Sequence, residues 1–194
     1  FDVTGTSTVN GGGTLTTQGT TTISMASANG TLSLGGRTWN NQGTLTIGGT
    51  GYLYFGYSSG GTNTLTNAAG GTLNLSSTNG EHFGFYSGTA IINNAGTLNH
   101  TVSGTHSING NITFNNTGTV SVSVGTLSIN GSGTDTGNYS ASSGAACNFN
   151  GGTRVLSAGS TVTVSGTGAV QVTGGTTHVN GMVTGTGYLN VAGG

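Results

Sequence analysis

The chain has 194 residues, of which 41 are glycine and none is proline, and only 3% of the residues carry a charge. Two arginines and no lysine cannot neutralise enough phosphates to hold nucleic acid or an anionic membrane surface, so both partners are excluded. No apolar run approaches the ~20 residues of a membrane span, and we expect no membrane insertion.

Polar and apolar residues alternate in short segments along the chain, as in S-V-S-V at 121–124, T-V-T-V at 161–164 and A-V-Q-V at 169–172. This period of two is typical of half-buried β-strands, and a disordered Gly/Ser-rich chain has no reason to keep it. Gly, Thr, Ser, Asn and Val are also poor helix formers. We therefore predict an ordered, all-β chain without helices.

One phrase recurs along the chain, and its clearest copy is N-N-Q-G-T-L-T-I at 40–47. A weaker copy, G-T-L-T-T, begins earlier at Gly13, and later copies begin at Asn67, Asn93 and Asn115. A phrase that returns every 20–30 residues is typical of a solenoid, in which each repeat stacks only on its neighbours. The glycine before the threonine of each clear copy is Gly43, Gly71, Gly96 and Gly118, at steps of 28, 25 and 22 residues.

Each copy of the phrase predicts a corner followed by a strand. Asn and Gly accept positive φ, so we expect them to form the corner. In the strand, the alternation places one set of residues inward and the other outward. The inward set is Leu15, Leu45, Leu73, Leu98 and Val120. The outward set, a candidate surface-contact column, is Thr14, Thr16, Thr44, Thr46, Thr72, Asn74, Thr97, Asn99, Thr119 and Ser121.

Two more short strands fit between successive copies of the phrase, which gives three strands and three corners per turn. The expected strands of the three complete repeats are 44–47, 52–55, 62–66, 72–75, 81–86, 89–92, 97–102, 105–108 and 112–115. After Gly118 the copies blur, but alternation continues as far as 188–191. We predict a parallel β-helix, roughly triangular, of about seven to eight turns of 20–30 residues, as a single domain over 1–194.

Aromatic residues gather on the second expected strand of two successive turns. In Y-L-Y-F at 52–55, Leu53 and Phe55 share one face and two tyrosines share the other. We expect Tyr54 to meet the ring of Phe83 or Phe85 of the next turn, with centroids ~4.5–7 Å apart. Internal stacking is one interpretation, and an exposed aromatic surface for sugar or protein contact is the other. The candidate aromatic contact residues are Tyr52, Tyr54, Tyr57 and Tyr86.

The residues that could carry chemistry are few and dispersed. Asp2, Glu81 and Asp135 are the only carboxylates, and the coil should hold them several turns apart. Glycoside cleavage needs two carboxyl groups within ~5–9.5 Å of each other, so we expect no enzyme and assign no catalytic residue. We also predict no cofactor and no cofactor-binding residue. Cys147 alternates with Phe149 and is interpreted as a small buried hydrophobe.

Four histidines are spread over the chain. His82 adjoins Glu81, and His100 and His106 fall within one expected turn, whereas His178 lies far away. A zinc site needs three or four ligands with supporting groups. We interpret these histidines as solvated or facing the wall of the coil and assign no metal site, with a chance metal site as the alternative.

The phrase N-N-x-G-T-L-x-[L/I], together with N-F-N-G-G-T-R-V-L-S-A-G-S-T-V-T-V-S-G-T-G at 148–168, resembles the repetitive passenger segments of large bacterial surface proteins. These are the autotransporter-like and filamentous-haemagglutinin-like β-solenoids. The resemblance covers nearly the whole chain, but it lies in the repeated sequence pattern and includes no catalytic motif. It implies a right-handed parallel β-helix, export to the cell surface or the extracellular space, and a role as adhesin, stalk or fibre.

Neither end of the chain has the features of a cap. Residues 1–10 are rich in Thr, Gly and Val like the middle of the chain, and polar and apolar residues still alternate at 187–192. An open solenoid end exposes unpaired backbone groups that invite pairing with another chain, and solenoids carry atypical capping repeats for this reason. We therefore expect further solenoid at both ends, from the same polypeptide or from copies of the chain, so that the chain is a segment of a longer protein or a fibre subunit.

These observations favour a structural or adhesive extracellular β-solenoid that forms a stalk or fibre by end-to-end stacking, with cell-surface glycans or proteins as further partners. An ice-binding protein is the alternative, because an outward threonine column resembles the T-x-T arrays of such solenoids. Asn74, Asn99 and Ser121 interrupt the second file of that array. A carbohydrate-active β-helix enzyme is a third hypothesis, which the shortage of carboxylates disfavours.

Overall fold

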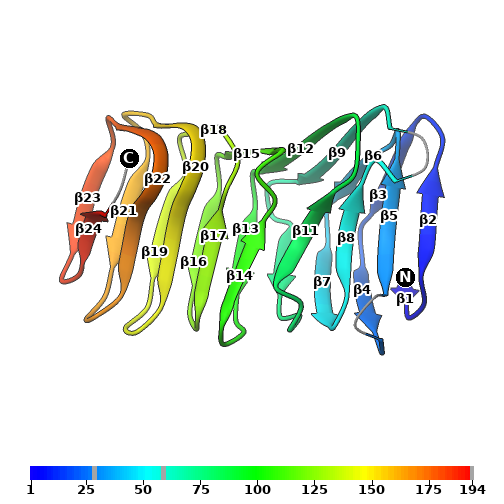
Figure 1. Cartoon of the computed structure of the whole chain (residues 1–194), viewed down its shortest axis with the longest axis horizontal. Helices are drawn as coiled ribbons and strands as arrows, with labels where there is room; N and C mark the ends of the chain where they lie inside the picture. Colours follow the sequence, from blue (N-terminus) through cyan, green and yellow to red (C-terminus); the bar gives the residue numbers. More distant parts are fainter. Residues whose placement is uncertain (28–29, 58–59, 193–194) are drawn as a thin grey trace.

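The computed structural model describes residues 1–27, 30–57 and 60–192, and its regular structure is β-strand throughout. The strands of successive turns pair in parallel and stack along one axis. Figure 1 shows an elongated coil with the two termini at opposite ends. The coil has about eight turns, which confirms the predicted all-β solenoid. Within these ranges no helix is long and apolar enough to span a membrane.

Three strands make up a full turn, and each belongs to one of three stacks, here called face A, face B and face C. Face A consists of β1 (Asp2–Val3), β4 (Thr20–Met25), β7 (Thr44–Gly49), β10 (Thr72–Leu75), β13 (Thr97–His100), β16 (Thr119–Val122), β19 (Asn138–Ala141), β21 (Thr161–Val164) and β23 (Met182–Gly185). Face B consists of β2 (Ser7–Asn10), β5 (Thr31–Gly35), β8 (Tyr52–Phe55), β11 (Glu81–Phe85), β14 (Thr105–Ile108), β17 (Thr126–Ile129), the first parts of β20 (Ala146–Leu156) and β22 (Ala169–Val179), and β24 (Tyr188–Val191).

Face C consists of β3 (Thr14–Thr17), β6 (Thr38–Asn41), β9 (Thr62–Asn67), β12 (Thr89–Asn94), β15 (Ile112–Asn116), β18 (Gly133–Asp135) and the later parts of β20 and β22. The two long strands run around a corner without a break, since β20 pairs first with β17 and then with β18. Faces B and C are thereby joined into one 15-stranded sheet, beside the 9-stranded sheet of face A.

The strands expected in the three complete repeats are confirmed. Each begins at the predicted residue and ends within two residues of the predicted end. The predicted inward ladder is confirmed for Leu45, Leu73, Leu98 and Val120, which pair in register and are completely buried. Full burial of a leucine stabilises the fold by about 1.5–3 kcal/mol. These residues therefore form one column of the core.

The prediction that the first copy of the phrase begins at Gly13 is wrong. Thr14 and Thr16 lie on β3 of face C, opposite Thr38 and Asn40, and so do not belong to the threonine column. The strand that pairs with Thr44–Gly49 is Thr20–Met25. Its segment T-T-Q-G-T-T-T-I carries a threonine at the inward position where later copies have leucine, so the apolar pattern pointed to the neighbouring G-T-L instead. Leu15 accordingly pairs with Trp39 and is only partly buried.

The glycine of the phrase has a different role from the one expected. Gly43, Gly96 and Gly118 are not among the residues with positive φ. Instead, a Cβ on Gly43 would lie 2.2 Å from the Gly19 carbonyl oxygen, and one on Gly118 would lie 2.1 Å from that of Gly96. Successive backbones approach too closely at this corner to admit a side chain, and glycine is the residue that allows such an approach.

The asparagines of the phrase point into the coil and do not form the turn. Asn41, Asn67, Asn94 and Asn116 are buried one above another. Each Nδ2 donates to the Oδ1 of the next, at 2.8, 2.8 and 2.9 Å. Each Nδ2 also donates to a backbone carbonyl of the face A strand one turn further along the coil, at 3.0 or 3.1 Å. This asparagine ladder satisfies its own buried amides and links face C to face A.

A buried ion pair follows the asparagine ladder. Asp135 pairs with Asn116 in the same column and accepts hydrogen bonds from the backbone N–H of Asn116 and from the Tyr139 hydroxyl, both at 2.9 Å. Its carboxylate pairs with Arg154, and both side chains are completely buried. The guanidinium lies 5.7 and 5.2 Å from the ring centroids of Phe114 and Phe149. Burial raises the pKa of Asp135, while the charge of Arg154 and the hydrogen bonds act to lower it.

The free thiol lies where it was expected. Cys147 and Phe149 are both buried in the coil and belong to the core. Burial raises the pKa of the Cys147 thiol to about 12, so it is protonated at neutral pH. The prediction that Cys147 is a small buried hydrophobe is confirmed.

Candidate functional site

Face A presents two outward files of short polar side chains. The register of the strands places the predicted outward residues of face A above one another, with Thr44, Thr72, Thr97 and Thr119 in one file. The complete first file is Thr20, Thr44, Thr72, Thr97, Thr119, Asn138, Thr161 and Met182. The second file is Asp2, Thr22, Thr46, Asn74, Asn99, Ser121, Ser140, Thr163 and Thr184.

The two files differ in their chemistry. In the second file, Asn99 Nδ2 donates to Asn74 Oδ1 at 3.1 Å, and Asn74 Nδ2 reaches Thr46 Oγ1 at 3.5 Å. These amides are therefore engaged along the axis. The first file begins with an unbroken run of threonines, spaced by one strand of about 4.8 Å. Its hydroxyl and methyl groups form a regular outward array.

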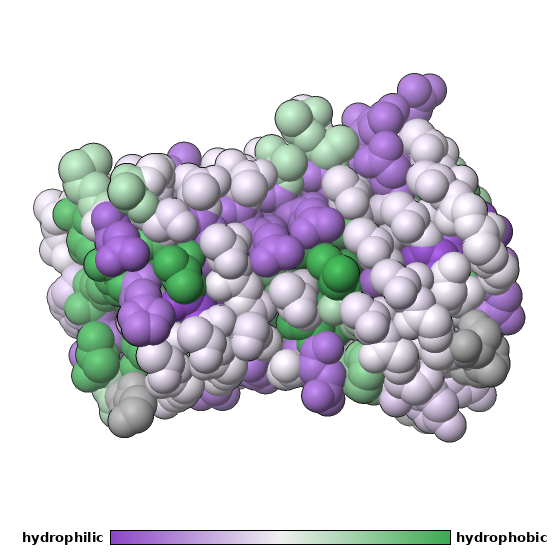
Figure 2. All heavy atoms as spheres, turned by 90° about the horizontal axis from the view of Figure 1, so that it is seen from above, coloured by the Kyte–Doolittle hydropathy of each residue, from purple (hydrophilic) through white to green (hydrophobic). Residues whose placement is uncertain are grey.

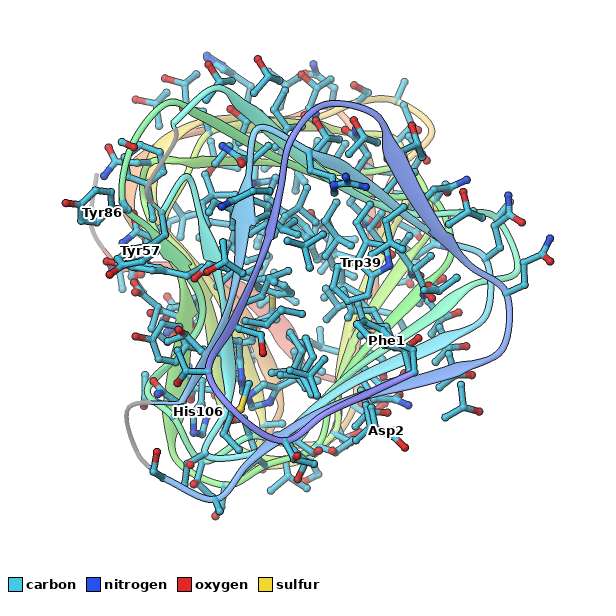
Figure 3. The ribbon with its side chains drawn as sticks, turned by 90° about the vertical axis from the view of Figure 1, so that its right-hand side faces the viewer. Phe1, Asp2, Trp39, Tyr57, Tyr86 and His106 are labelled. Atoms are coloured by element: carbon cyan, nitrogen blue, oxygen red, sulfur yellow. The ribbon has the colours of Figure 1, made fainter. Side chains whose placement is uncertain are left out.

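The predicted aromatic residues form a surface cluster, here called the tyrosine patch, of Tyr52, Tyr54, Tyr57 and Tyr86. The centroid of Tyr54 lies 5.6, 6.2 and 6.1 Å from those of Tyr52, Tyr57 and Tyr86. Tyr57 and Tyr86 are 5.4 Å apart and remain 47% and 59% exposed. Figure 3 shows both on the outside of the coil. The patch spans two successive turns of face B.

The expected partner of Tyr54 was wrong, although the two strands do lie on neighbouring turns. β8 and β11 pair so that Gly84 stands opposite Tyr54. A Cβ on Gly84 would lie 2.5 Å from the Tyr54 ring, so this glycine leaves the space that the ring occupies. Phe83 faces inward and pairs with Phe55 at 6.3 Å. The two turns therefore hold an internal phenylalanine pair and an external tyrosine patch.

Tyr52 is a partly buried member of the patch. Burial raises the pKa of Tyr52 above its ordinary 10.0, and the nearby Tyr54 and Glu81 add to the rise. Its hydroxyl is therefore neutral at physiological pH. Rings with a polar edge and an apolar face suit contact with sugars and with protein surfaces.

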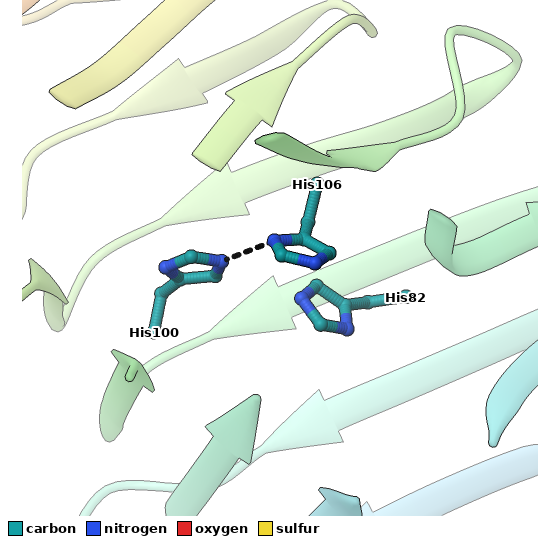
Figure 4. Close-up of side chains that lie close together, drawn as sticks. All are labelled: His82, His100 and His106. Atoms are coloured by element: carbon teal, nitrogen blue, oxygen red, sulfur yellow. Dashed lines mark hydrogen bonds between the residues drawn. The ribbon is translucent and has the colours of Figure 1, made fainter. Parts of the chain in front are cut away.

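Three of the four histidines meet inside the coil, where His82 lies on β11, His100 ends β13 and His106 lies on β14. Figure 4 shows their rings at the corner between face A and face B. Their exposed fractions are 0%, 0% and 4%. The interpretation of these histidines as solvated or wall-facing was wrong, and only His178 lies exposed on the surface as expected.

The geometry of this histidine cluster is tight. His100 Nε2 lies 3.2 Å from His106 Nδ1, and His100 Nδ1 lies 2.9 Å from the Val124 carbonyl oxygen. The ring centroids of the three side chains are 4.9–5.4 Å apart. Neither ring nitrogen of His82 has a hydrogen-bond partner among the described residues. A buried polar group left without a partner costs about 1–3 kcal/mol.

Burial keeps the cluster uncharged. It lowers the pKa of His82 to about 3, and the neighbouring His100 and His106 add to the effect. It lowers the pKa of His100 to about 4, where the hydrogen bond to Val124 opposes the shift and His106 reinforces it. Burial also lowers the pKa of His106. At neutral pH the three imidazoles are neutral and carry lone pairs, which is the form that binds metal ions.

Comparison of the chain with family models, with curated proteins and with solved structures gives no match. The resemblance to bacterial surface solenoids therefore stays a prediction from the sequence.

Proposed function

We propose that the chain is a rigid structural and adhesive segment of a β-solenoid outside the cell, and that the tyrosine patch contacts glycans or proteins. The tyrosine patch is the observation that carries this proposal. Tyr54 packs against the other three rings across two turns, and the two outermost, Tyr57 and Tyr86, remain about half exposed. Clustered exposed aromatics on a soluble protein favour a recognition surface.

The surroundings of the patch support adhesion by stacking and hydrogen bonding, because the chain has almost no charge to contribute. Tyr52 and Tyr54 lie on β8, which pairs with β11, and Tyr57 and Tyr86 follow within two residues of the ends of these strands, so the rings are preorganised. Rigid aromatic side chains lose little conformational entropy on binding, which favours weak but specific contacts. Many copies on a fibre or stalk would add their individual affinities through avidity.

The test is binding of chain-coated beads to immobilised glycans and to cell surfaces. The double variant Tyr57→Ser, Tyr86→Ser should lose most of the binding, since it removes the exposed rings and leaves the core unchanged. Tyr188→Ser is the matched control, because Tyr188 is 58% exposed and lies outside the patch. Equal binding by wild type and double variant would remove the patch from the proposal.

We extend the proposal to end-to-end stacking. The last described turn exposes Met182, Val183 and Val191, the last of them 70% exposed. In Figure 2 apolar residues gather at this end of the coil. One further turn, from the same polypeptide or from another copy, would cover these side chains and pair with β23 and β24. Light scattering over a range of concentrations should detect growing assemblies, and Val191→Lys should suppress them. A monomer at every concentration would contradict stacking between copies.

Ice binding by face A is a second candidate function. The first file favours it, since Thr20, Thr44, Thr72, Thr97 and Thr119 follow one another in register over successive turns. Thermal hysteresis in dilute solution is the test. Activity that disappears in Thr97→Tyr and survives in Thr64→Tyr, on the outer side of face C, would support this candidate. Absence of hysteresis in the wild type would remove it.

A further inference from the structure

The histidine cluster occupies positions where the coil otherwise uses aliphatic residues. His100 pairs with Leu75 on the preceding turn and with Val122 on the following turn. His106 pairs with Leu127. Leucine and valine close the same corner on neighbouring turns, so packing alone does not call for imidazole there. Three buried imidazoles at one corner need another explanation.

A β-bulge brings the third histidine into the group. The register between β11 and β14 shifts between Glu81 and Phe83, and His82 is the residue inside this irregularity. Bulges re-aim a side chain at the expense of ladder hydrogen bonds. His82 is completely buried by this arrangement, yet both of its ring nitrogens lack a partner among the described residues. A buried group without a partner needs a specific explanation, and a bound ion is one that supplies it.

The distances agree with a shared ligand. The Val124 carbonyl accepts from His100 Nδ1, which leaves a lone pair on His100 Nε2 facing His106 Nδ1 at 3.2 Å. Two nitrogens on a tetrahedral ion with bonds of ~2.0–2.1 Å lie about 3.3 Å apart. One candidate ligand atom from each histidine lies within 4.8 Å of the other two. Modest ring rotations therefore complete a triad.

We infer that His82, His100 and His106 form a binding site for one divalent transition-metal ion of the zinc class. Neutral imidazole nitrogens suit Zn²⁺, Ni²⁺ or Cu²⁺, whereas Ca²⁺ and Mg²⁺ require oxygen ligands. Three protein ligands leave one tetrahedral position for water. The Val124 carbonyl is the outer partner that fixes the His100 tautomer, as carbonyls commonly do for metal-binding histidines.

The ion would act as a clip between two turns. His82 belongs to one turn, and His100 and His106 belong to the next, on either side of the corner that joins β13 to β14. The clip lies at the bulge, where the backbone ladder is irregular, and so it adds a link where regular pairing is weakest. This site is independent of the adhesive function proposed above.

The experiment uses the untagged chain, treated with EDTA and dialysed. Titration with zinc chloride, followed by calorimetry, should give about one zinc ion per chain, and the melting temperature should rise with zinc concentration. His82→Leu and His106→Leu each remove one ligand, and at position 106 the new residue matches Leu127 of the next turn. Each should lower the zinc affinity at least about tenfold. His178→Gln, at an exposed histidine, should bind zinc as the wild type does.

Cobalt gives a readout that does not depend on any variant. Co²⁺ in a four-coordinate imidazole site should give intense visible absorption bands, which zinc then abolishes by competition. The inference is overturned if the wild type shows neither zinc binding nor the cobalt bands. It is also overturned if His82→Leu and His106→Leu both keep the wild-type affinity, or if His178→Gln loses it equally.

Discussion

The asparagine ladder and the histidine cluster are both buried polar groups at corners of the same coil, yet they are satisfied differently. Asn67 donates to Asn94 Oδ1 and to the carbonyls of Gly71 and Thr97, and it accepts from Asn41. His82 makes no hydrogen bond through its ring to any described residue. The ladder repeats with the phrase of the sequence, whereas the cluster occurs once. In a solenoid, a repeated and satisfied polar group belongs to the fold, and a unique and unsatisfied one indicates a site.

The largest effect should come from the ion pair that follows the ladder. Arg154→Met leaves the carboxylate of Asp135 buried without its counter-ion, and we expect a loss of about 3–5 kcal/mol in the free energy of unfolding. Urea denaturation measures this loss. The double variant Asp135→Leu, Arg154→Met should recover most of it, because Leu156 already follows Asp135 in the same column. No recovery in the double variant would mean that the pair has a role other than neutralising its own charge.

Breaking the ladder itself should cost less. Asn67→Leu removes one of the acceptors of Asn41 Nδ2 and leaves the Oδ1 of Asn94 without its donor, and we expect a loss of about 2–4 kcal/mol. Asn40→Leu is the control, since Asn40 lies half-buried on the outward side of β6 and should change stability by less than about 0.5 kcal/mol. Equal losses in the two variants would show that burial of the amide, and not its bonding, is what matters.

Acid should destabilise the metal-free chain through the histidine cluster. The unfolded chain takes up protons near pH 6.5, but the folded chain keeps His82 neutral down to about 3 and His100 down to about 4. Stability is therefore constant above pH 6.5 and falls as the pH drops through the window below it. From pH 6.5 to about 5.5 the loss from His82 should be on the order of 1 kcal/mol.

Thermal melts over this pH range measure the acid effect. His82→Leu should weaken the dependence without abolishing it, because His100 also has a lowered pKa, and His178→Gln should leave it as in the wild type. A wild-type melting temperature that does not change between pH 6.5 and 5 would contradict the buried, neutral state of these imidazoles.

A small effect should also follow from removing one imidazole at neutral pH in the absence of metal. His106→Leu extends the column already formed by Leu127, so the free energy of unfolding should change by less than about 1.5 kcal/mol. Denaturation of the EDTA-treated protein tests this against the larger loss expected for Asn67→Leu. A loss as large as that of the ladder variant would indicate that the histidines serve the fold, as the asparagines do.

Polar–apolar alternation was sufficient to predict the strands of the complete repeats, because each strand of a coil has one face inside and one outside. The same alternation, applied to T-L-N-H and T-H-S-I, places His100 and His106 inward. The inward position of His82 could not be predicted in this way, since it depends on a bulge that shifts the period. A local pattern therefore finds two members of the cluster and misses the third.

Pairing between turns was harder to predict than the strands themselves. Asp135 meets Arg154 because β18 and β20 align Gly133 with Arg154, and nothing local in the sequence gives that register. The asparagines were interpreted as turn residues, since Asn is common in turns, but their buried bonding depends on identical neighbours one turn away. The prediction that Thr14 belongs to the threonine column was wrong for the same reason. Contacts along the axis depend on the length of each turn, which varies.

The asparagine ladder also has a direction. Each side-chain amide donates toward the C-terminal end of the coil, from Asn41 through Asn67 and Asn94 to Asn116. Backbone dipoles alternate along a strand and largely cancel, but these side-chain dipoles add, and aligned hydrogen bonds polarise one another. The ladder therefore carries an axial dipole whose positive end faces Asp135, the next residue of the column, whereas the surface bonds from Asn99 to Asn74 and from Asn74 to Thr46 run in the opposite direction. Two such ladders placed end to end in the same direction have dipoles that attract, whereas ladders that meet with opposite directions repel.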